Sequence, residues 1–128
     1  MVTFVNGEPD KTLYRHFKIH QRKGANDLSS MREVAKRRMK YLKAWGIPDL
    51  IIVDGGKAQV SAFKIPEISV IGLAKRNETL IIPLTKGYKE VRLKRGGALR
   101  LMQRMRDEAH RFARKYHHHL LKRELLYN

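Results

Sequence analysis

Asp54 is the residue whose position in the sequence points most clearly to chemistry. It ends a run of four apolar residues, 50–53, and two glycines follow it at once. Such a run is too short for a helix and predicts a strand that is buried on both faces. An aspartate at the carboxyl end of a buried strand lies where α/β sheets place their ligands, and it could hold a divalent cation together with substrate phosphate. The other open interpretation is that Asp54 caps the helix that follows.

A second candidate, His110, belongs to a long predicted helix that begins near residue 98. Apolar residues recur along this helix at spacings of three and four, which predicts one packed stripe. His110 lies at the margin of that stripe, with Arg106 and Arg114 one turn to either side. From there a histidine can face a strand end, although a histidine in such a place is more often structural than catalytic. The run 117–119 cannot place three histidines on one face, so we expect no metal site there.

The elements that must position these residues follow from the spacing of apolar residues and from turn signals. A hairpin is expected over residues 1–19, with strands at 2–5 and 14–19 on either side of an Asn-Gly turn. Ser30 and Glu33 form a capping-box pattern before a helix that Gly46 ends. Further elements are expected in this order: a strand at 50–53, a helix at 57–64, a strand at 69–74 and a hairpin of 79–82 with 88–93.

The charge of the chain points to a polyanionic partner. Its 28 Lys and Arg residues exceed 12 Asp and Glu, which gives a formal net charge of +16. An excess of this size is typical of proteins that bind nucleic acid, and without a lipid-anchor motif we favour nucleic acid over anionic lipid. The predicted nucleic-acid contacts are Arg37, Lys57, Lys75, Arg76, Arg106 and Arg114.

Composition also excludes several classes of protein. The 128 residues predict a single domain, 1–128, that is large enough for a hydrophobic core. Because the chain contains no cysteine, it can form neither a disulfide framework nor a thiolate metal site. Since no apolar run approaches membrane-spanning length and no signal-peptide pattern opens the chain, we expect a cytoplasmic protein that does not bind membranes.

Taken together, these residues carry a family resemblance. The chain resembles the C-terminal endonuclease domain of UvrC, the incision subunit of bacterial nucleotide excision repair. Of the matching runs, the Asp-Gly-Gly-Lys block and the last block are the most specific. In order, the runs are Phe-Val-Asn-Gly at 4–7, Tyr-Arg at 14–15, Ser-Met at 30–31, the run 48–57, Gly-Leu-Ala-Lys at 72–75, Ala-Leu-Arg-Leu at 98–101 and the run 106–113.

The resemblance implies an α/β fold of the ribonuclease H-like type, with a mixed sheet and flanking helices. It also implies a DNA endonuclease that cuts one strand 5′ to a lesion by means of an Asp-Asp-His set and a divalent cation, Mg²⁺ or Mn²⁺. Asp54 matches the second aspartate of that set and would be a metal ligand. His110 matches the histidine and would either handle protons or bind the scissile phosphate.

The chain departs from the family pattern in ways that affect its expected activity. The family's first aspartate lies on a central strand in a Phe-Asp-Ile-Ser-His-like run, and this sequence contains no such run. We therefore expect an N-terminally truncated domain whose sheet lacks that strand and which does not cut DNA alone. The segment through which the family docks on UvrB is also absent. Two functions stay open: a metal-dependent endonuclease domain, and a non-catalytic, nucleic-acid-binding remnant of one.

The charge excess gives a first testable prediction. The chain should bind DNA with little sequence preference, and the logarithm of its affinity should fall linearly with the logarithm of salt concentration. The expected slope is about 0.9 per phosphate neutralised on duplex DNA, because each contact releases condensed counterions. Fluorescence anisotropy with one labelled duplex over a salt series measures this slope. An affinity that stays constant from low to moderate salt would contradict the electrostatic interpretation.

Overall fold

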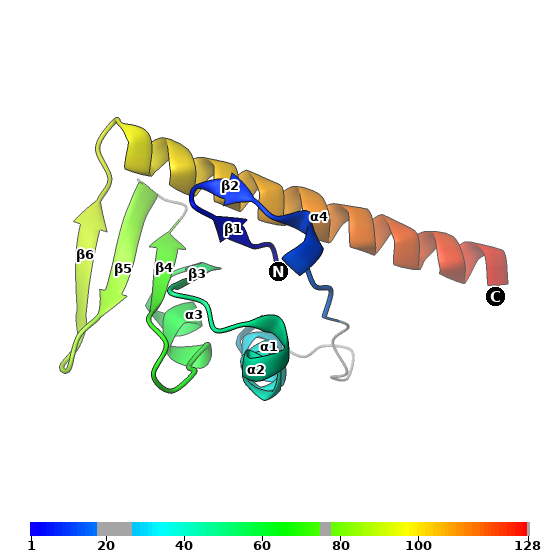
Figure 1. Cartoon of the computed structure of the whole chain (residues 1–128), viewed down its shortest axis with the longest axis horizontal. Helices are drawn as coiled ribbons and strands as arrows, with labels where there is room; N and C mark the ends of the chain where they lie inside the picture. Colours follow the sequence, from blue (N-terminus) through cyan, green and yellow to red (C-terminus); the bar gives the residue numbers. More distant parts are fainter. Residues whose placement is uncertain (18–26, 75–77, 128) are drawn as a thin grey trace. The chain divides into compact units, whose positions relative to one another are not determined.

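A computed structural model describes residues 1–17, 27–74 and 78–127 of the chain (Figure 1). The backbone divides into two compact units. The sheet unit comprises Ile19–Arg95, and the helix unit comprises Met1–Lys18 together with Gly96–Asn128. None of the helices in the described ranges is both long enough and apolar enough to cross a membrane.

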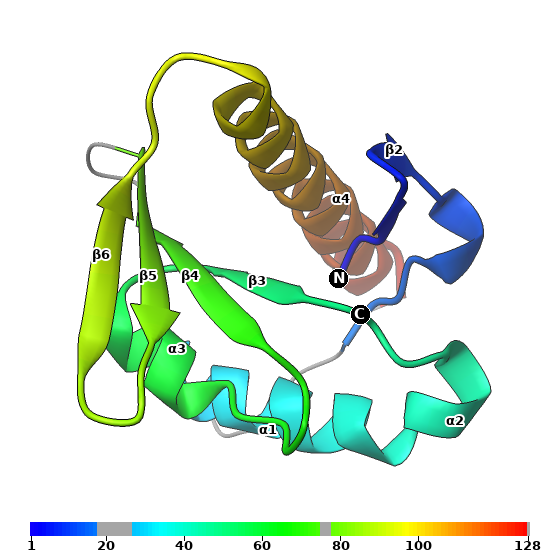
Figure 2. The same cartoon turned by 60° about the vertical axis from the view of Figure 1, so that its left-hand side comes forward.

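The sheet unit is built on four strands in the order β3-β4-β5-β6 (Figure 2). Strand β3 (Ile51–Asp54) pairs in parallel with β4 (Val70–Ala74), and the remaining pairs are antiparallel. Strands β5 (Thr79–Pro83) and β6 (Tyr88–Arg92) form the predicted hairpin, in which Leu84 N donates to Gly87 O at 3.0 Å. The predicted mixed α/β architecture is confirmed.

Helices α1 (Asp27–Lys40) and α3 (Lys57–Ala62) cover one face of this sheet, and α2 (Leu42–Trp45) follows α1 after a break at Tyr41 (Figure 2). Their shared core joins Ala35 of α1 to apolar residues of α3 and the sheet. Because side chains alternate along a strand, residues that pair across β3, β4 and β5 direct their side chains to the same face. The buried core consists of Ala35, Val53, Val60, Phe63, Ile65, Val70 and Ile81.

A glycine in β4 permits the turn after β3 to pack closely on the sheet. Gly72 pairs with Val53, and a Cβ atom at Gly72 would lie 2.6 Å from the carbonyl oxygen of Gly55 and 2.6 Å from Val60 Cγ2. Real Cβ atoms do not approach other atoms so closely. The backbone that follows Asp54 therefore occupies space that any other residue at position 72 would fill.

The helix unit consists of a short N-terminal hairpin and α4 (Gly97–Tyr127). Strand β1 (Phe4–Val5) pairs with β2 (Glu8–Pro9) across the predicted Asn-Gly turn, and the 3₁₀ helix η1 (Lys11–Leu13) follows. Arg104 of α4 ties the hairpin to the helix. Its guanidinium donates to Gly7 O and Glu8 Oε2, both at 3.4 Å, and lies 5.9 Å from the centre of the Phe4 ring.

Aromatic stacking fastens the segment after η1 to α4. The His16 ring lies between Phe112 and Tyr116, with centroid distances of 4.0 and 4.2 Å, and Tyr14 meets Phe112 edge-on at 5.1 Å. Partial desolvation of the ring lowers the pKa of His16 below its usual value near 6.5. The N-terminal ammonium and the nearby His119 and Lys115 lower this pKa further.

The predicted strand at 14–19 is wrong for residues 14–17, which form no strand; residues 18 and 19 lie outside the described ranges. Two causes are visible. Asp10 Oδ1 accepts from Thr12 N at 3.1 Å and so directs the chain into η1, and the rings of Tyr14 and His16 then pack on α4. One trace of the predicted pairing remains, because Met1 and Arg15 exchange two backbone hydrogen bonds, of 2.9 and 3.1 Å.

Two further predictions need correction. Helix α1 begins at Asp27, so Ser30 lies inside the helix and is not its N-cap, whereas Gly46 ends α2 with a φ of +86° as expected. The expectation that residues 50–53 are buried on both faces is wrong at its start, since Leu50 is 42% exposed. Within the described parts of the chain, β3 pairs on one side only, with β4.

The contact at Gly72 gives a second prediction. Gly72→Ala should destabilise the sheet unit by about 1–3 kcal/mol, because the added methyl group forces the backbone at Gly55 to move. Urea unfolding followed by circular dichroism measures the change. Gly97→Ala is the matched control, because its Cβ atom would meet nothing within 4 Å at the start of α4. Equal free energies of unfolding for the two variants would show that the backbone at Gly55 can move without loss of stability.

The stacked histidine gives a third prediction. Since the pKa of His16 is lowered in the fold, the unfolded chain binds this proton more readily, and stability should fall as pH drops below about 6.5. His16→Phe keeps a ring in the stack but cannot titrate. Between pH 7.5 and pH 5.5, the midpoint temperature of thermal unfolding should decrease less in the variant than in the parent. Equal losses in both proteins would assign the pH dependence to other groups.

Candidate functional site

Asp54 is the last residue of β3, and its side chain is exposed. Strand alternation directs it to the face opposite Val53, away from the core beneath α1 and α3. Its partner in β4 is Leu73, and the next residue extends the pairing, since Gly55 N donates to Leu73 O at 3.1 Å. The carboxylate is thus exposed to solvent, and the backbone before and after it is hydrogen-bonded to β4.

The turn after Asp54 is fixed by a side chain of α3. Gln59 Oε1 accepts from Gly56 N at 3.0 Å, which satisfies one of the donors left open at the start of the helix. Gly56 is the N-cap residue of α3, so the interpretation of Asp54 as that cap is wrong. The Gly-x-x-Gln pattern at 56–59 resembles half of a capping box and could have revealed this role in the sequence. The tight fit at Gly72 has no such local signal.

Lys57 is the first residue of α3, three residues after Asp54, and it carries a positive charge near the carboxyl end of β3. Its Nζ atom lies 3.5 Å from Glu90 Oε1, and both side chains are more than half exposed. Ion pairs of this kind contribute little to stability, because water and salt screen them. Breaking the ion pair between Lys57 and Glu90 therefore costs little, and the predicted contact of Lys57 with nucleic acid stays a prediction.

The other predicted residues are distributed over both units. Arg37 lies on α1, where its Nη1 atom is 3.7 Å from Glu33 Oε2. His110, Arg106 and Arg114 lie on α4 in the helix unit, His110 and Arg106 half-buried and Arg114 exposed. Asp54 and Lys57 belong to the sheet unit. Lys75 and Arg76 lie outside the described residues.

A divalent cation fits these side chains only in part. Asp54 supplies an exposed carboxylate, the hard oxygen donor that such ions prefer. However, no group of three or more His, Asp or Glu residues within 1–17, 27–74 and 78–127 is arranged to hold a metal. The described residues thus provide one ligand of the predicted type and do not complete a site.

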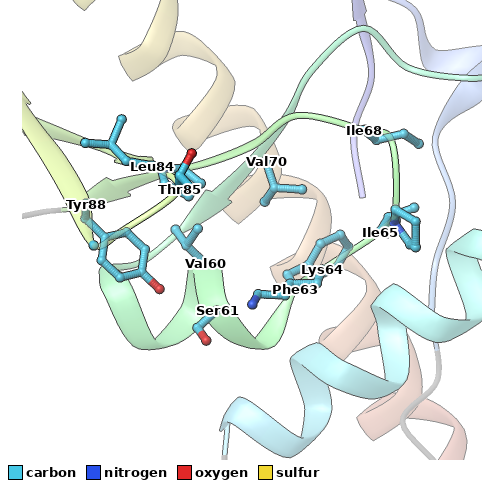
Figure 3. A pocket seen from close by; sticks show the side chains of 13 residues that line it. Val60, Ser61, Phe63, Lys64, Ile65, Ile68, Val70, Leu84, Thr85 and Tyr88 are labelled. Carbon is cyan, nitrogen blue, oxygen red and sulfur yellow. The ribbon is translucent and has the colours of Figure 1, made fainter.

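The sheet unit contains a cavity of about 500 Å³ (Figure 3), and Asp54 is not among the residues that line it. It lies between α3, the start of β4 and the turn that joins β5 to β6, with Val60, Phe63, Val70 and Tyr88 among its lining residues. Because β3 and β4 run parallel, Asp54 is at the carboxyl end of the pair whereas Val70 begins β4. The cavity is therefore at the other end of these strands.

The helix unit holds a cationic cleft of about 620 Å³ around His16 that sequence analysis missed. Lys11 and Lys115 line it together with the stacked rings. Arg111 also lines it, but its Nε donates to both carboxylate oxygens of Glu108 at 3.1 Å, and this contact lowers the pKa of Glu108. The positive charge that the cleft offers to a ligand therefore comes mainly from Lys11 and Lys115, and neither lysine belongs to a recognisable sequence motif.

Comparison with known proteins identifies the family. Residues 1–113 match the model of the UvrC RNase H endonuclease domain. A UvrABC system protein C from Prosthecochloris aestuarii is 44% identical in an alignment of 128 positions that covers 94% of this chain and 21% of that protein. Proteins of the same name from Methanococcoides burtonii and Dehalococcoides mccartyi are 44% and 41% identical, over 91% and 94% of this chain.

The chain thus spans about a fifth of the length of these relatives. The family match covers both units and includes β3 with Asp54 as well as the part of α4 that carries His110. The sequence resemblance is therefore confirmed, and the chain belongs to the family of UvrC RNase H endonuclease domains.

Proposed function

We propose that this domain hydrolyses a phosphodiester bond of DNA with the help of Mg²⁺ or Mn²⁺, as the 5′-incising nuclease of nucleotide excision repair. The observation that carries the proposal is the exposed carboxylate of Asp54 at the end of β3, before the turn into α3, in a chain of this family. The name of the relatives assigns them to the UvrABC system, and we extend that assignment to this chain. DNA is the proposed substrate, and other excision-repair subunits, UvrB among them, are proposed partners through regions of the relatives that this chain does not span.

In this proposal Asp54 is a metal ligand, and its position depends on the rigid turn beside it. When bound, the cation would polarise a phosphoryl oxygen and lower the pKa of a water molecule. Lys57, one helical position beyond the turn, would exchange Glu90 for a phosphate of the bound strand. This exchange keeps the strand close to Asp54 and costs little, since the pair it breaks is exposed.

His110 would contribute from α4 in one of two ways. A histidine changes its charge near neutral pH, so it could accept or donate a proton during hydrolysis. It could instead bind the scissile phosphate as a cation, with the positive charges of Arg106 and Arg114 on the same helix raising the local attraction for the DNA strand. The pH dependence of cutting distinguishes a proton acceptor from the other roles, because a proton acceptor must be neutral, whereas a proton donor and a phosphate-binding cation must both be protonated.

A second candidate function is non-catalytic binding of nucleic acid. Two observations favour it: the described residues hold no cluster of three metal-ligating side chains, and β3 lacks a partner on one side within the described sheet. A single carboxylate gives a weak site for Mg²⁺, which gives up its water ligands reluctantly. In this case the +16 charge would act alone, in attracting DNA.

The fourth prediction separates these functions. Nicking of supercoiled plasmid is measured with Mg²⁺ and with Mn²⁺, for the 128-residue chain and for a version extended at its N-terminus by the family's first strand. We expect cutting by the extended version only, because it supplies a second carboxylate. Asp54→Asn in the extended version should abolish cutting and leave DNA affinity unchanged or slightly higher, since it removes a ligand and a negative charge near phosphate.

The matched control is Asp49→Asn, which removes an exposed carboxylate five residues before Asp54, ahead of the start of β3. It should leave cutting intact. Metal-dependent nicking by the 128-residue chain that is lost on Asp54→Asn would show that another group replaces the family's first aspartate. Absence of cutting by both versions, with DNA binding retained, would favour the non-catalytic function.

A further inference from the structure

An aromatic pair marks the junction between α1 and α2. The rings of Tyr41 and Trp45 lie face to face, with centroids 4.2 Å apart and planes inclined by 8°. The backbone enforces this arrangement, because Tyr41 N donates to Arg38 O at 3.0 Å and Trp45 N donates to Tyr41 O at 2.8 Å. Residues four positions apart in such a turn are neighbours on one face, so the two rings are held together before any ligand arrives.

Trp45 lies near a buried cation, and its partner Tyr41 is partly exposed. The guanidinium carbon of Arg38 lies 5.6 Å from the centre of the Trp45 ring, and Arg38 is only 5% exposed. Arg38 Nη2 also donates to Gly46 O at 2.8 Å, so this buried cation is fixed in place under the indole. Cation–π attraction is strongest where water is excluded. Tyr41 is 43% exposed.

The surroundings of the stack are strongly basic. Lys40 and Lys43 flank Tyr41 in sequence and are exposed, and Lys36 is exposed on the last turns of α1. A protein-binding surface usually has an apolar centre that is depleted in lysine. Sites for single-stranded nucleic acid instead combine aromatic platforms for the bases with cations for the backbone. Charge complementarity therefore favours nucleic acid over a protein partner at this surface.

We propose that the Tyr41–Trp45 stack binds an unstacked base of single-stranded DNA, while Lys40 and Lys43 contact the phosphates on either side of that base. The inference rests on the proposed function in taking DNA as the substrate, and it adds a preference for an unpaired segment. Bases inside a duplex already stack on one another and offer no free face to Tyr41. The platform therefore selects DNA in which a base is unpaired, whereas the net charge attracts DNA of any kind.

The test compares affinities of the 128-residue chain for a labelled 16-nucleotide oligothymidine and for a 16-base-pair duplex at one salt concentration. Tyr41→Leu keeps an apolar side chain but removes the ring. It should weaken binding of the single strand by about tenfold, which lies within the range measured for loss of one stacked base. Binding of the duplex should change by less than about twofold. Tyr41→Phe is the matched control and should bind the single strand as the parent does.

Salt dependence separates stacking from charge. Tyr41→Leu removes no phosphate contact, so its slope of log affinity against log salt should equal that of the parent. Lys40→Gln should weaken binding of both DNAs and reduce the slope by about 0.7 for the single strand and about 0.9 for the duplex. A reduced slope in Tyr41→Leu would show that the variant disturbs the basic surface, which would count against a stacking role.

Trp45 provides a second readout, because it is the only tryptophan in the chain. A base that stacks on Tyr41 alters the environment of the ring pair, so the single strand should quench Trp45 fluorescence and the duplex should not. This measurement needs no substitution and therefore holds even if Tyr41→Leu unfolds. The absence of quenching by a bound single strand would overturn the inference.

The remaining outcomes distinguish the two proposals. If the parent binds both DNAs equally and Tyr41→Leu changes neither affinity, the stacking inference fails while DNA binding stands. If the parent binds neither DNA, the proposed function fails as well. Self-association that Tyr41→Leu abolishes, together with unchanged single-strand affinity, would show that a protein surface covers the stack and would also overturn the inference.

Discussion

The parallel pairing of β3 with β4 is the interaction on which the position of Asp54 depends. This pairing brings Gly72 against the backbone of the turn after Asp54, where a Cβ atom would lie 2.6 Å from the Gly55 carbonyl oxygen. The hydrogen bond from Gly55 N to Leu73 O extends the pairing past the end of the strand. At the start of α3, Gln59 Oε1 accepts a hydrogen bond from Gly56 N. One close steric contact and two hydrogen bonds thus fix the backbone around one exposed carboxylate, which is the kind of rigid support that its proposed role as a metal ligand requires.

The local parts of the fold could be predicted from the sequence because local chemistry determines them. The hairpin of β5 and β6, the strand β4 and the long helix α4 follow from alternation, from the turn at Gly87 and from a sustained 3-4 spacing. Asp54 could be placed at a strand end for the same reason. The N-terminal segment was mispredicted, because its alternating residues Tyr14 and His16 pack on rings of α4 that lie far away in the sequence.

The site remains a prediction in its chemistry, and the contacts that support its backbone were not predicted. The family motif singles out Asp54 and His110, since their residue types match a known set, but nothing in their spacing relates one to the other. The role of Gly72 depends on the register between β3 and β4, and the register becomes visible only when the strands are paired. The aromatic pair at Tyr41 and Trp45 has the spacing of an ordinary helix stripe, so its stacking and exposure also required the structure.

The length of α4 has a consequence for the local stability of the helix unit. At 1.5 Å per residue, its 31 residues extend for about 46 Å. The ring and hydrogen-bond contacts with the N-terminal segment fall between Arg104 and Tyr116, whereas Leu125 and Leu126 near the end are 86% and 64% exposed. A helix without tertiary contacts is only marginally stable in water. Amide hydrogen exchange along α4 should therefore be slow in its middle turns and increase steadily toward its carboxyl end, where each turn opens without disturbing the one before it.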